Sequence, residues 1–248
     1  GLFDFSFGRT KLFYSRRIGL SEGNPIPIIG GARLTGRIGA LDVGVLNIQT
    51  QSFEGVEAEN FGVIRLKKQI LNPQSYIGSI YTHRFGLDGA QNVVMGFDLD
   101  YNIKDENFIQ FKLAQTIDNT EDYNQDFLSG TGVISRLTID RRANLGWFYR
   151  FMVNYTGEGF NPGIGFVRTT NTADYYGSFG YGWLAPEASR IKQHQIQLRN
   201  YSIQSYDGFD LRSRSINLEW STQFKLAGNI SSEFVYRQEH LLEDEDFD

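Results

Sequence analysis

The side chains that could carry a hydrolytic reaction are few, because this 248-residue chain has three histidines and no cysteine. A hydrolase needs a nucleophile or an activated water beside a general base. His83 and Ser79 are expected on one polar strand face, and the next strand supplies Asp98. Antiparallel pairing through the intervening turn leaves His83 several residues out of register with Asp98. His194 falls on an apolar face and His240 lies beside an acidic run, so we expect no enzyme.

Oxygen-rich loops are the candidate metal sites. Residues 118–126 carry several carboxylates and amides, which are ligands that Ca²⁺ accepts. They lack the glycine and the terminal glutamate of an EF-hand, so a solvated loop is the favoured interpretation. The acidic run 243–246 is interpreted in the same way, and residues 161–163 (Asn-Pro-Gly) are typical of a turn. The sequence predicts no metal site and no cofactor.

Charged residues of both signs fall on the polar faces of the expected strands and are the candidate lining of an aqueous interior. They are Arg65, Lys67, Asp98, Asp100, Lys112, Arg136, Arg150, Arg199, Glu219 and Glu233. Because the signs are mixed, no single-sign selectivity ring is expected. If the hairpin at 104–108 has a three-residue loop, Asp100 faces Lys112 across the strands. Structural pairing is favoured for these charges, and a path for a polar solute is the alternative.

The elements that must position these charges are long strands. Side chains alternate between the two faces of a strand, and residues 93–103 alternate almost without exception. One face is apolar and the other is mostly polar. The apolar face carries Val93, Met95, Phe97, Leu99, Tyr101 and Ile103. A strand of this length, with one polar face and one apolar face, is typical of a protein wall between lipid and water.

About twelve such strands are expected, with no helix. They lie near 31–39, 41–51, 60–69, 75–85, 92–104, 107–117, 132–140, 145–155, 173–184, 190–204, 211–225 and 228–238. Strands of soluble proteins centre on 5–6 residues, whereas several of these run to about ten. The pattern therefore favours an antiparallel outer-membrane β-barrel over a soluble antiparallel sandwich, which remains the alternative.

Composition is compatible with this fold class. Aromatic residues make up 15% of the chain and charged residues 21%. No apolar run is long enough for a transmembrane helix. The net charge of −5 argues against nucleic-acid binding, which needs a basic surface. Without cysteine there is no disulfide framework.

Two regions are expected along the chain. Residues 1–27 form a lead-in segment, either a linker or a plug, and residues 28–248 form the barrel domain. The pair Arg16-Arg17 in the lead-in would anchor a plug or, in the favoured alternative, pair with carboxylates from a linker. No signal peptide opens the chain and an acidic run ends it, so we expect a fragment with a truncated barrel.

Five stretches then carry a family resemblance. They are Leu12–Gly19 (LFYSRRIG), Ile28–Arg37 (IIGGARLTGR), Asn60–Lys68 (NFGVIRLKK), Ile77–Arg84 (IGSIYTHR) and Gly159–Val167 (GFNPGIGFV). In this order they resemble a family of uncharacterised Gram-negative outer-membrane proteins, in which a carbohydrate-binding-module family 9-like domain precedes a C-terminal β-barrel. The resemblance implies an outer-membrane barrel that continues beyond this chain. It implies no reaction.

Together these observations predict a non-catalytic outer-membrane β-barrel module. The lipid bilayer is its expected partner, and passage or capture of a polar ligand is its expected role. A glycan-derived ligand is suggested by the resemblance alone. The alternatives are a soluble β-rich binding module and an anchoring barrel without transport. The sequence gives neither the ligand nor the oligomeric state.

Overall fold

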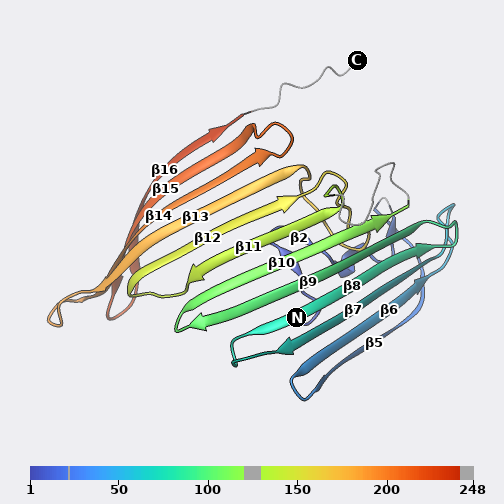
Figure 1. Ribbon diagram of the computed structural model, residues 1–248, viewed down its shortest axis with the longest axis horizontal. Helices are drawn as coiled ribbons and strands as arrows, with labels where there is room; N and C mark the ends of the chain where they lie inside the picture. The colour runs from blue at the N-terminus through green and yellow to red at the C-terminus, as the bar shows by residue number, and fades with distance from the viewer. Residues whose placement is uncertain (22, 120–129, 241–248) are drawn as a thin grey trace. The chain divides into compact units, whose positions relative to one another are not determined.

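The computed structural model describes residues 1–21, 23–119 and 130–240, and within them the protein is all-β. Twelve strands form one antiparallel sheet in which each strand lies beside its neighbours in sequence, from β5 to β16 (Figure 1). The strands are β5 (Ile28–Ile38), β6 (Leu41–Thr50), β7 (Glu59–Gln69), β8 (Tyr76–Gly86), β9 (Gln91–Lys104), β10 (Asn107–Asp118), β11 (Val133–Arg141), β12 (Gly146–Thr156), β13 (Thr172–Leu184), β14 (Ile191–Ser205), β15 (Leu211–Phe224) and β16 (Asn229–Glu239). The expected all-β class and strand count are confirmed.

The sheet is not closed into a barrel. Within the described ranges, β5 is hydrogen-bonded to β6 alone and β16 to β15 alone, so these two strands are the edges of the sheet. The expectation of a barrel is therefore confirmed only as far as a long-stranded antiparallel sheet. The strands run to 15 residues in β14, well beyond the usual length in soluble sheets.

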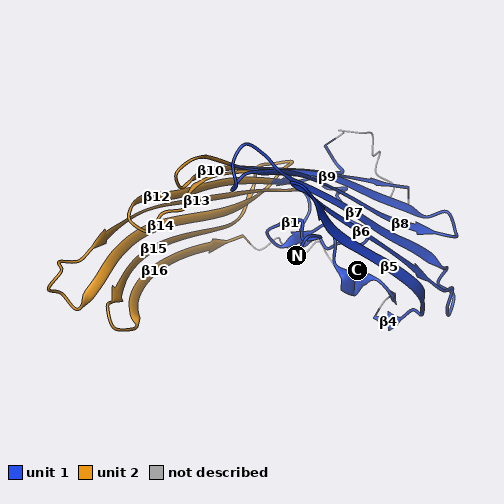
Figure 2. Cartoon of the chain, turned by 90° about the horizontal axis from the view of Figure 1, so that it is seen from below, with its two compact units in different colours: residues 1–101, 110–136, 155–171 blue, residues 102–109, 137–154, 172–248 orange. Residues whose placement is uncertain are grey.

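The chain divides into two compact units, which are coloured separately in Figure 2 and described separately below. Unit 1 comprises Gly1–Tyr101, Gln110–Arg136 and Tyr155–Asn171. Unit 2 comprises Asn102–Ile109, Leu137–Asn154 and Thr172–Asp248. The expected boundary at residue 27 does not separate the units, because the lead-in segment belongs to unit 1 together with the strands that follow it.

Connections at the two ends of the strands differ in length. Short turns join strands at one end, for example residues 39–40 between β5 and β6 and residues 225–228 between β15 and β16. Among the connections that are described in full, the longest, residues 51–58 and 157–171, occur at the other end, which also has the short turns 87–90 and 206–210. Short turns at one end and longer loops at the other are typical of outer-membrane barrels. We call these the short-turn end and the long-loop end.

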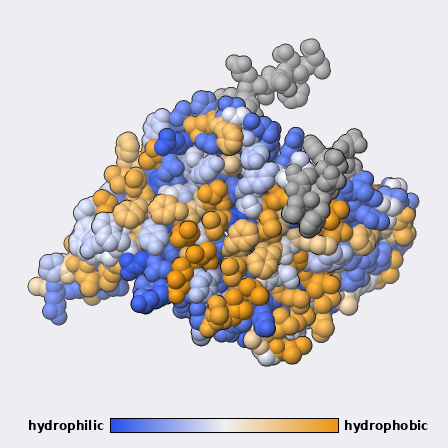
Figure 3. All heavy atoms as spheres, viewed as in Figure 1, coloured by the Kyte–Doolittle hydropathy of each residue, from blue (hydrophilic) through white to orange (hydrophobic). Residues whose placement is uncertain are grey.

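The two faces of the sheet have opposite character. In unit 1, we call the face bearing Asp98 the inner face and the face bearing Phe97 the outer face. Asp98 is 2% exposed, whereas Phe97 is 42% exposed. In unit 2 the inner face bears Arg199 and the outer face bears Leu198, which is 50% exposed. In Figure 3 hydrophobic side chains gather across the middle of the visible face.

Residues 1–27 cover the inner face of unit 1. They contain four two-residue strands, β1 (Ser6–Phe7), β2 (Thr10–Lys11), β3 (Leu20–Ser21) and β4 (Asn24–Pro25), and one 3₁₀ turn at Ser15–Arg17. We call residues 1–27 the plug segment. The loop 157–171 holds it through hydrogen bonds between the backbones of Lys11 and Phe166 and from Tyr14 N–H to the Ile164 carbonyl.

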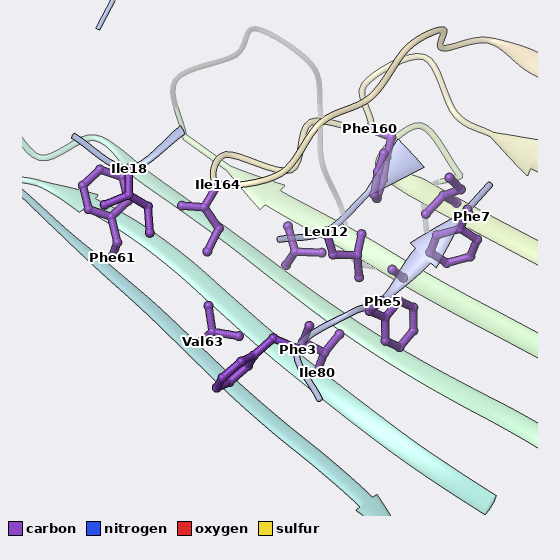
Figure 4. Close-up of a cluster of buried hydrophobic side chains, with 13 residues drawn as sticks. Phe3, Phe5, Phe7, Leu12, Ile18, Phe61, Val63, Ile80, Phe160 and Ile164 are labelled. Atoms are coloured by element: carbon purple, nitrogen blue, oxygen red, sulfur yellow. The ribbon is translucent and has the colours of Figure 1, made fainter. Parts of the chain in front are cut away.

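The plug segment supplies Phe3, Phe5, Phe7, Leu12 and Ile18 to the apolar core of unit 1, shown in Figure 4. Phe3, Phe5 and Phe7 alternate along it and, with Leu12, pack over the inner face. The sheet contributes Phe61, Val63, Ile80, Val94, Ala114 and Ile134, and the 157–171 loop contributes Phe160 and Ile164. The centre of the inner face is therefore an apolar patch, with charged residues beside it.

Candidate functional site

A buried ion pair lies on the inner face of unit 1. Arg65 on β7 donates two hydrogen bonds to Asp98 on β9, from Nη1 to Oδ1 at 2.8 Å and from Nη2 to Oδ2 at 2.7 Å. Each side chain is 3% exposed. The pair spans β8, because Arg65 is opposite Ile80 and Asp98 is opposite Gly78. A bidentate geometry of this kind offsets part of the cost of removing both charges from water.

The plug segment contributes to the same cluster. The ring of Phe5 lies 5.0 Å from the Arg65 guanidinium and 5.5 Å from the Lys112 ammonium, distances at which a cation and an aromatic ring attract. Lys112 Nζ also donates to the backbone carbonyl of Ser6 at 3.0 Å. Arg136 lies against Gly8 of the plug segment. Three candidate lining residues therefore hold the plug in place.

Asp100 and Lys112 do not form the expected pair. Asp100 accepts a hydrogen bond from Gln110, and Lys112 donates to the Ser6 carbonyl. The expectation assumed a three-residue loop in the hairpin. In the structure β9 ends at Lys104 and β10 begins at Asn107, so that assumption and the side-chain partners it gave were wrong.

Lys67 lies at the short-turn end of the same face. Its Nζ is 3.6 Å from the centre of the Tyr76 ring. A cavity of about 480 Å³ opens here and is lined by Asp4, Asp42, Arg65, Lys67 and Tyr76 among others. Both signs of charge line it, so it has no obvious preference for one sign of solute.

The candidate residues of unit 2 form two further groups on its inner face. Asp140, with a side chain 1% exposed, accepts from Arg150 Nη2 at 2.8 Å and from Arg142 Nε at 3.1 Å. Arg199 donates to Glu219 at 2.5 Å and lies 3.4 Å from Glu233. The second group is half-exposed, which reduces what each pair contributes to stability.

The two histidines of the sheet occupy the outer face. His83 stacks on Phe85 at 4.5 Å and lies 2.8 Å from Asn60 Oδ1. It therefore faces away from Asp98, which is a correction to the polar face expected for it. His194 lies between Trp183 and Trp220 on the apolar face, as expected from the sequence.

A second cavity, of about 300 Å³, opens at the long-loop end of unit 1. It is lined by Arg17, Arg84, Ala90, Gln91, Asn92, Asp118, Asn161 and Gly163. We call it the polar pocket. Its residues come from the plug segment, from β8, β9 and β10, and from the 157–171 loop. Apart from Ala90 and Gly163, every lining residue has a side chain that can donate or accept a hydrogen bond. Gly163 offers only its backbone groups.

Asn92 organises the polar pocket. Its Nδ2 donates to Asp118 Oδ2 at 2.6 Å and to the Asn161 carbonyl at 2.8 Å, and its Oδ1 accepts from the Gly163 N–H at 2.8 Å. Arg17 extends from the 3₁₀ turn and donates to the Gly165 carbonyl at 2.9 Å. The pocket is thus built on a fixed amide with one acidic and two basic side chains at its rim.

Sequence reasoning missed both the polar pocket and the plug core. Asn92 and Asp118 are single residues on long strands, and no spacing links them to Asn161. The alternation of Phe3, Phe5 and Phe7 is a signal that could have identified an apolar plug face. Arg17 was considered as a plug anchor or as a partner of carboxylates, and in the structure it donates to the backbone carbonyl of Gly165.

Metal sites remain without support. Among residues 1–21, 23–119 and 130–240, no group of histidine, aspartate or glutamate side chains could hold a metal ion. Most of the oxygen-rich loop 118–126 and all of the run 243–246 lie outside the described residues. In the same described ranges, no helix is long and apolar enough to span a membrane.

No family model, curated protein or solved structure matches this chain. The family resemblance carried by the five sequence stretches therefore stays a prediction.

Proposed function

We propose that this chain is part of the wall of an outer-membrane β-barrel and has no catalytic role. One observation carries the proposal: large apolar side chains lie exposed along the outer face of the sheet, while an ion pair is buried on its inner face. The charged residues Arg65 and Asp98 are buried, whereas Met95, Phe97 and Trp147 are 42–54% exposed. Exposed apolar side chains on this scale mark a surface that contacts something other than water.

The soluble alternative explains this arrangement less well. In an antiparallel sandwich the apolar faces of the strands meet in the core and the polar faces meet solvent. Here the apolar outer face lies uncovered in both units, with Phe151 and Leu218 exposed in unit 2 as Phe97 is in unit 1. Lipid would cover these side chains without a second sheet.

Capture and anchoring fit the inner face better than free passage. The plug segment is fixed to unit 1 by its apolar core and by Lys112 and Arg65, which a path for solutes would have to cross or displace. A packed inner face of this kind supports a closed module. The polar pocket, which remains accessible, is then the candidate site for a ligand.

The membrane assignment is tested by placing a charge on the outer face. Leu218→Arg would put a guanidinium among lipid tails and lower the free energy of unfolding in bilayers by roughly 2–4 kcal/mol. The control is Leu226→Arg in the turn 225–228, where the leucine is 96% exposed and outside the strands. On a water-facing sheet both changes would stay within about 0.5 kcal/mol, and that result would reject the proposal.

A second candidate function, capture of a small polar ligand, is favoured by the polar pocket. Its volume of about 300 Å³ is at the lower end for ligand sites. Arg17 offers guanidinium donors to a carboxylate, Arg84 adds positive charge although Glu59 holds it, and Gln91 and Asp118 can bond hydroxyl groups. A small hydroxylated acid is therefore the ligand class that the pocket fits.

Calorimetric titration with glucuronate and glucose tests this second function. We expect glucuronate to bind more tightly than glucose, because glucose lacks the carboxylate. Arg17→Ala should weaken glucuronate binding about tenfold, whereas Arg16→Ala, next to it but not part of the pocket lining, should leave it unchanged. Equal weakening by both variants, or no binding of either sugar, would remove the pocket as a ligand site of this class.

A further inference from the structure

The outer face of unit 2 is graded along its strands. The register across β13, β14, β15 and β16 defines rows of side chains that lie side by side on this face. From the short-turn end the rows are Trp183–His194–Thr222–Ile230, Tyr181–Ile196–Trp220–Ser232, Phe179–Leu198–Leu218–Phe234, Gly177–Asn200–Ile216–Tyr236 and Tyr175–Ser202–Arg214–Gln238. We number them rows 1 to 5. Rows 1 and 2 carry the tryptophans, row 3 is wholly apolar, row 4 is mixed, and row 5 is mostly polar.

All three tryptophans of the chain lie near the short-turn end of this face. Trp183 and Trp220 pack edge-to-face at 5.3 Å, with His194 beside both. Trp147 on β12 stacks on Phe179 at 4.9 Å and contacts Tyr181 at 4.7 Å. Tryptophan favours the boundary between lipid tails and water, where its apolar ring and its N–H are both satisfied.

Charged residues follow immediately beyond the aromatic rows. Glu187, Arg190 and Lys225 lie in or beside the short turns at this end, and Lys225 Nζ donates to the Glu187 carbonyl. The order along the strands is thus the charged turns, the tryptophan-bearing rows 1 and 2, and then the wholly apolar row 3. This is the sequence of environments met on moving from water into a bilayer.

The opposite boundary lies inside the strands. In row 5 the exposed Arg214 lies beside Ser202 and Gln238, and its Nε donates to Asn200 at 3.1 Å. β14 nevertheless continues to Ser205, and β15 begins at Leu211. A row of polar side chains on the apolar face of a continuing strand marks the point at which that face returns to water.

We propose that the bilayer contacts unit 2 asymmetrically: its hydrocarbon lies against rows 3 and 4, the tryptophan-bearing rows 1 and 2 mark its boundary at the short-turn end, and the strands project into water from row 5 onward. The inference rests on the proposed membrane function. Its partner is a lipid bilayer, recognised by aromatic side chains at one level and aliphatic ones at the next.

Single-cysteine labelling tests the position of the boundary at row 5. Only the introduced cysteine can react, because the chain has no cysteine of its own. Leu218→Cys and Arg214→Cys lie on the same face of β15, four residues apart, and both native side chains are exposed. Each variant is reconstituted in phosphatidylcholine vesicles, freeze–thawed with a membrane-impermeant maleimide, and compared with the same variant in denaturing detergent. We expect the cysteine at 214 to react at least tenfold faster than that at 218.

The outcomes distinguish the proposed boundary at row 5 from the proposed membrane function on which it rests. Fast labelling at both positions would mean that no lipid covers the face, which overturns the membrane proposal itself. Slow labelling at both would leave the membrane proposal standing and overturn the boundary at row 5. For the other boundary, lipids brominated near the headgroup should quench tryptophan fluorescence more than lipids brominated near the chain ends. The reverse order would place the tryptophans deep in the bilayer and reject this assignment.

Discussion

Gly78 lies directly opposite Asp98 in the β8–β9 pair, beneath the ion pair that Asp98 forms with Arg65. A Cβ atom at this glycine would lie 2.5 Å from Asp98 Oδ1 and 2.6 Å from Arg65 Nη1. The absence of a side chain on β8 is what allows the two charges to meet across it. The pair therefore depends on three adjacent strands rather than on two.

Gly78→Ala should separate Arg65 from Asp98. We expect the free energy of unfolding to fall by about 1–3 kcal/mol, the usual cost of adding a methyl group to a packed site. Urea unfolding of the reconstituted protein measures the change. Gly36→Ala on β5 is the control, because a Cβ there meets no atom within 4 Å. Equal effects of the two variants would show that the space above Gly78 is not needed.

Asp98→Ala should destabilise the protein more, because it leaves the Arg65 guanidinium buried without its carboxylate. The expected loss is about 3–5 kcal/mol. Glu59→Gln removes the comparable but half-exposed contact with Arg84 and should cost about 1 kcal/mol or less. Thermal unfolding of the two variants in one detergent compares their losses of stability. A loss at Asp98 no larger than that at Glu59 would mean that water reaches the buried pair.

Phe5→Ala should loosen the plug segment. The side chain is 2% exposed and contacts two cationic groups, so we expect a cost of roughly 3–5 kcal/mol and faster proteolysis within residues 1–27. Leu20→Ala, at a leucine that is 51% exposed, is the control. If the plug segment closes the interior, vesicles with the Phe5 variant should also become more permeable to small sugars. Unchanged permeability despite faster proteolysis would place the barrier elsewhere.

The apolar rows of unit 2 should make the protein prefer thin bilayers. Rows 1 to 4 span six residue-to-residue steps of β13, from Trp183 to Gly177, or about 20 Å at ~3.3 Å per step. Tilt makes the height shorter still, below the ~25 Å band usual in barrels. We expect a higher unfolding midpoint in lipids with 12-carbon chains than in lipids with 18-carbon chains. A midpoint independent of chain length would contradict the assigned rows.

Strand positions and faces were predictable where alternation is strict. Along 93–103 the expected apolar and polar faces are the outer and inner faces of β9, because the outer face is wholly apolar and the inner face is polar apart from Val94 and Gly96. In β8 both faces mix the two kinds: Ile77 and His83 share one face, and Ile80 and Arg84 share the other. The sequence there could not tell which side His83 would take.

Contacts across many residues were harder to predict. The partners of Asp100 and Lys112 depend on the length of a single turn, and the polar pocket joins Arg17, Asn92 and Asn161 from three distant segments. The division into two units crosses the strands β9 to β12 and leaves no mark in composition. These features depend on how the chain packs, which local patterns do not encode.

The plug core also sets an order of assembly. Phe5 comes early in the chain, yet its cluster includes Ala114 on β10, Ile134 on β11 and Ile164 in a loop beyond β12. Contacts between residues so far apart form slowly, because long stretches of chain must be ordered first. The plug segment therefore emerges before the strands of its cluster and docks after them. Until then its aromatic side chains are exposed, which favours association with other chains.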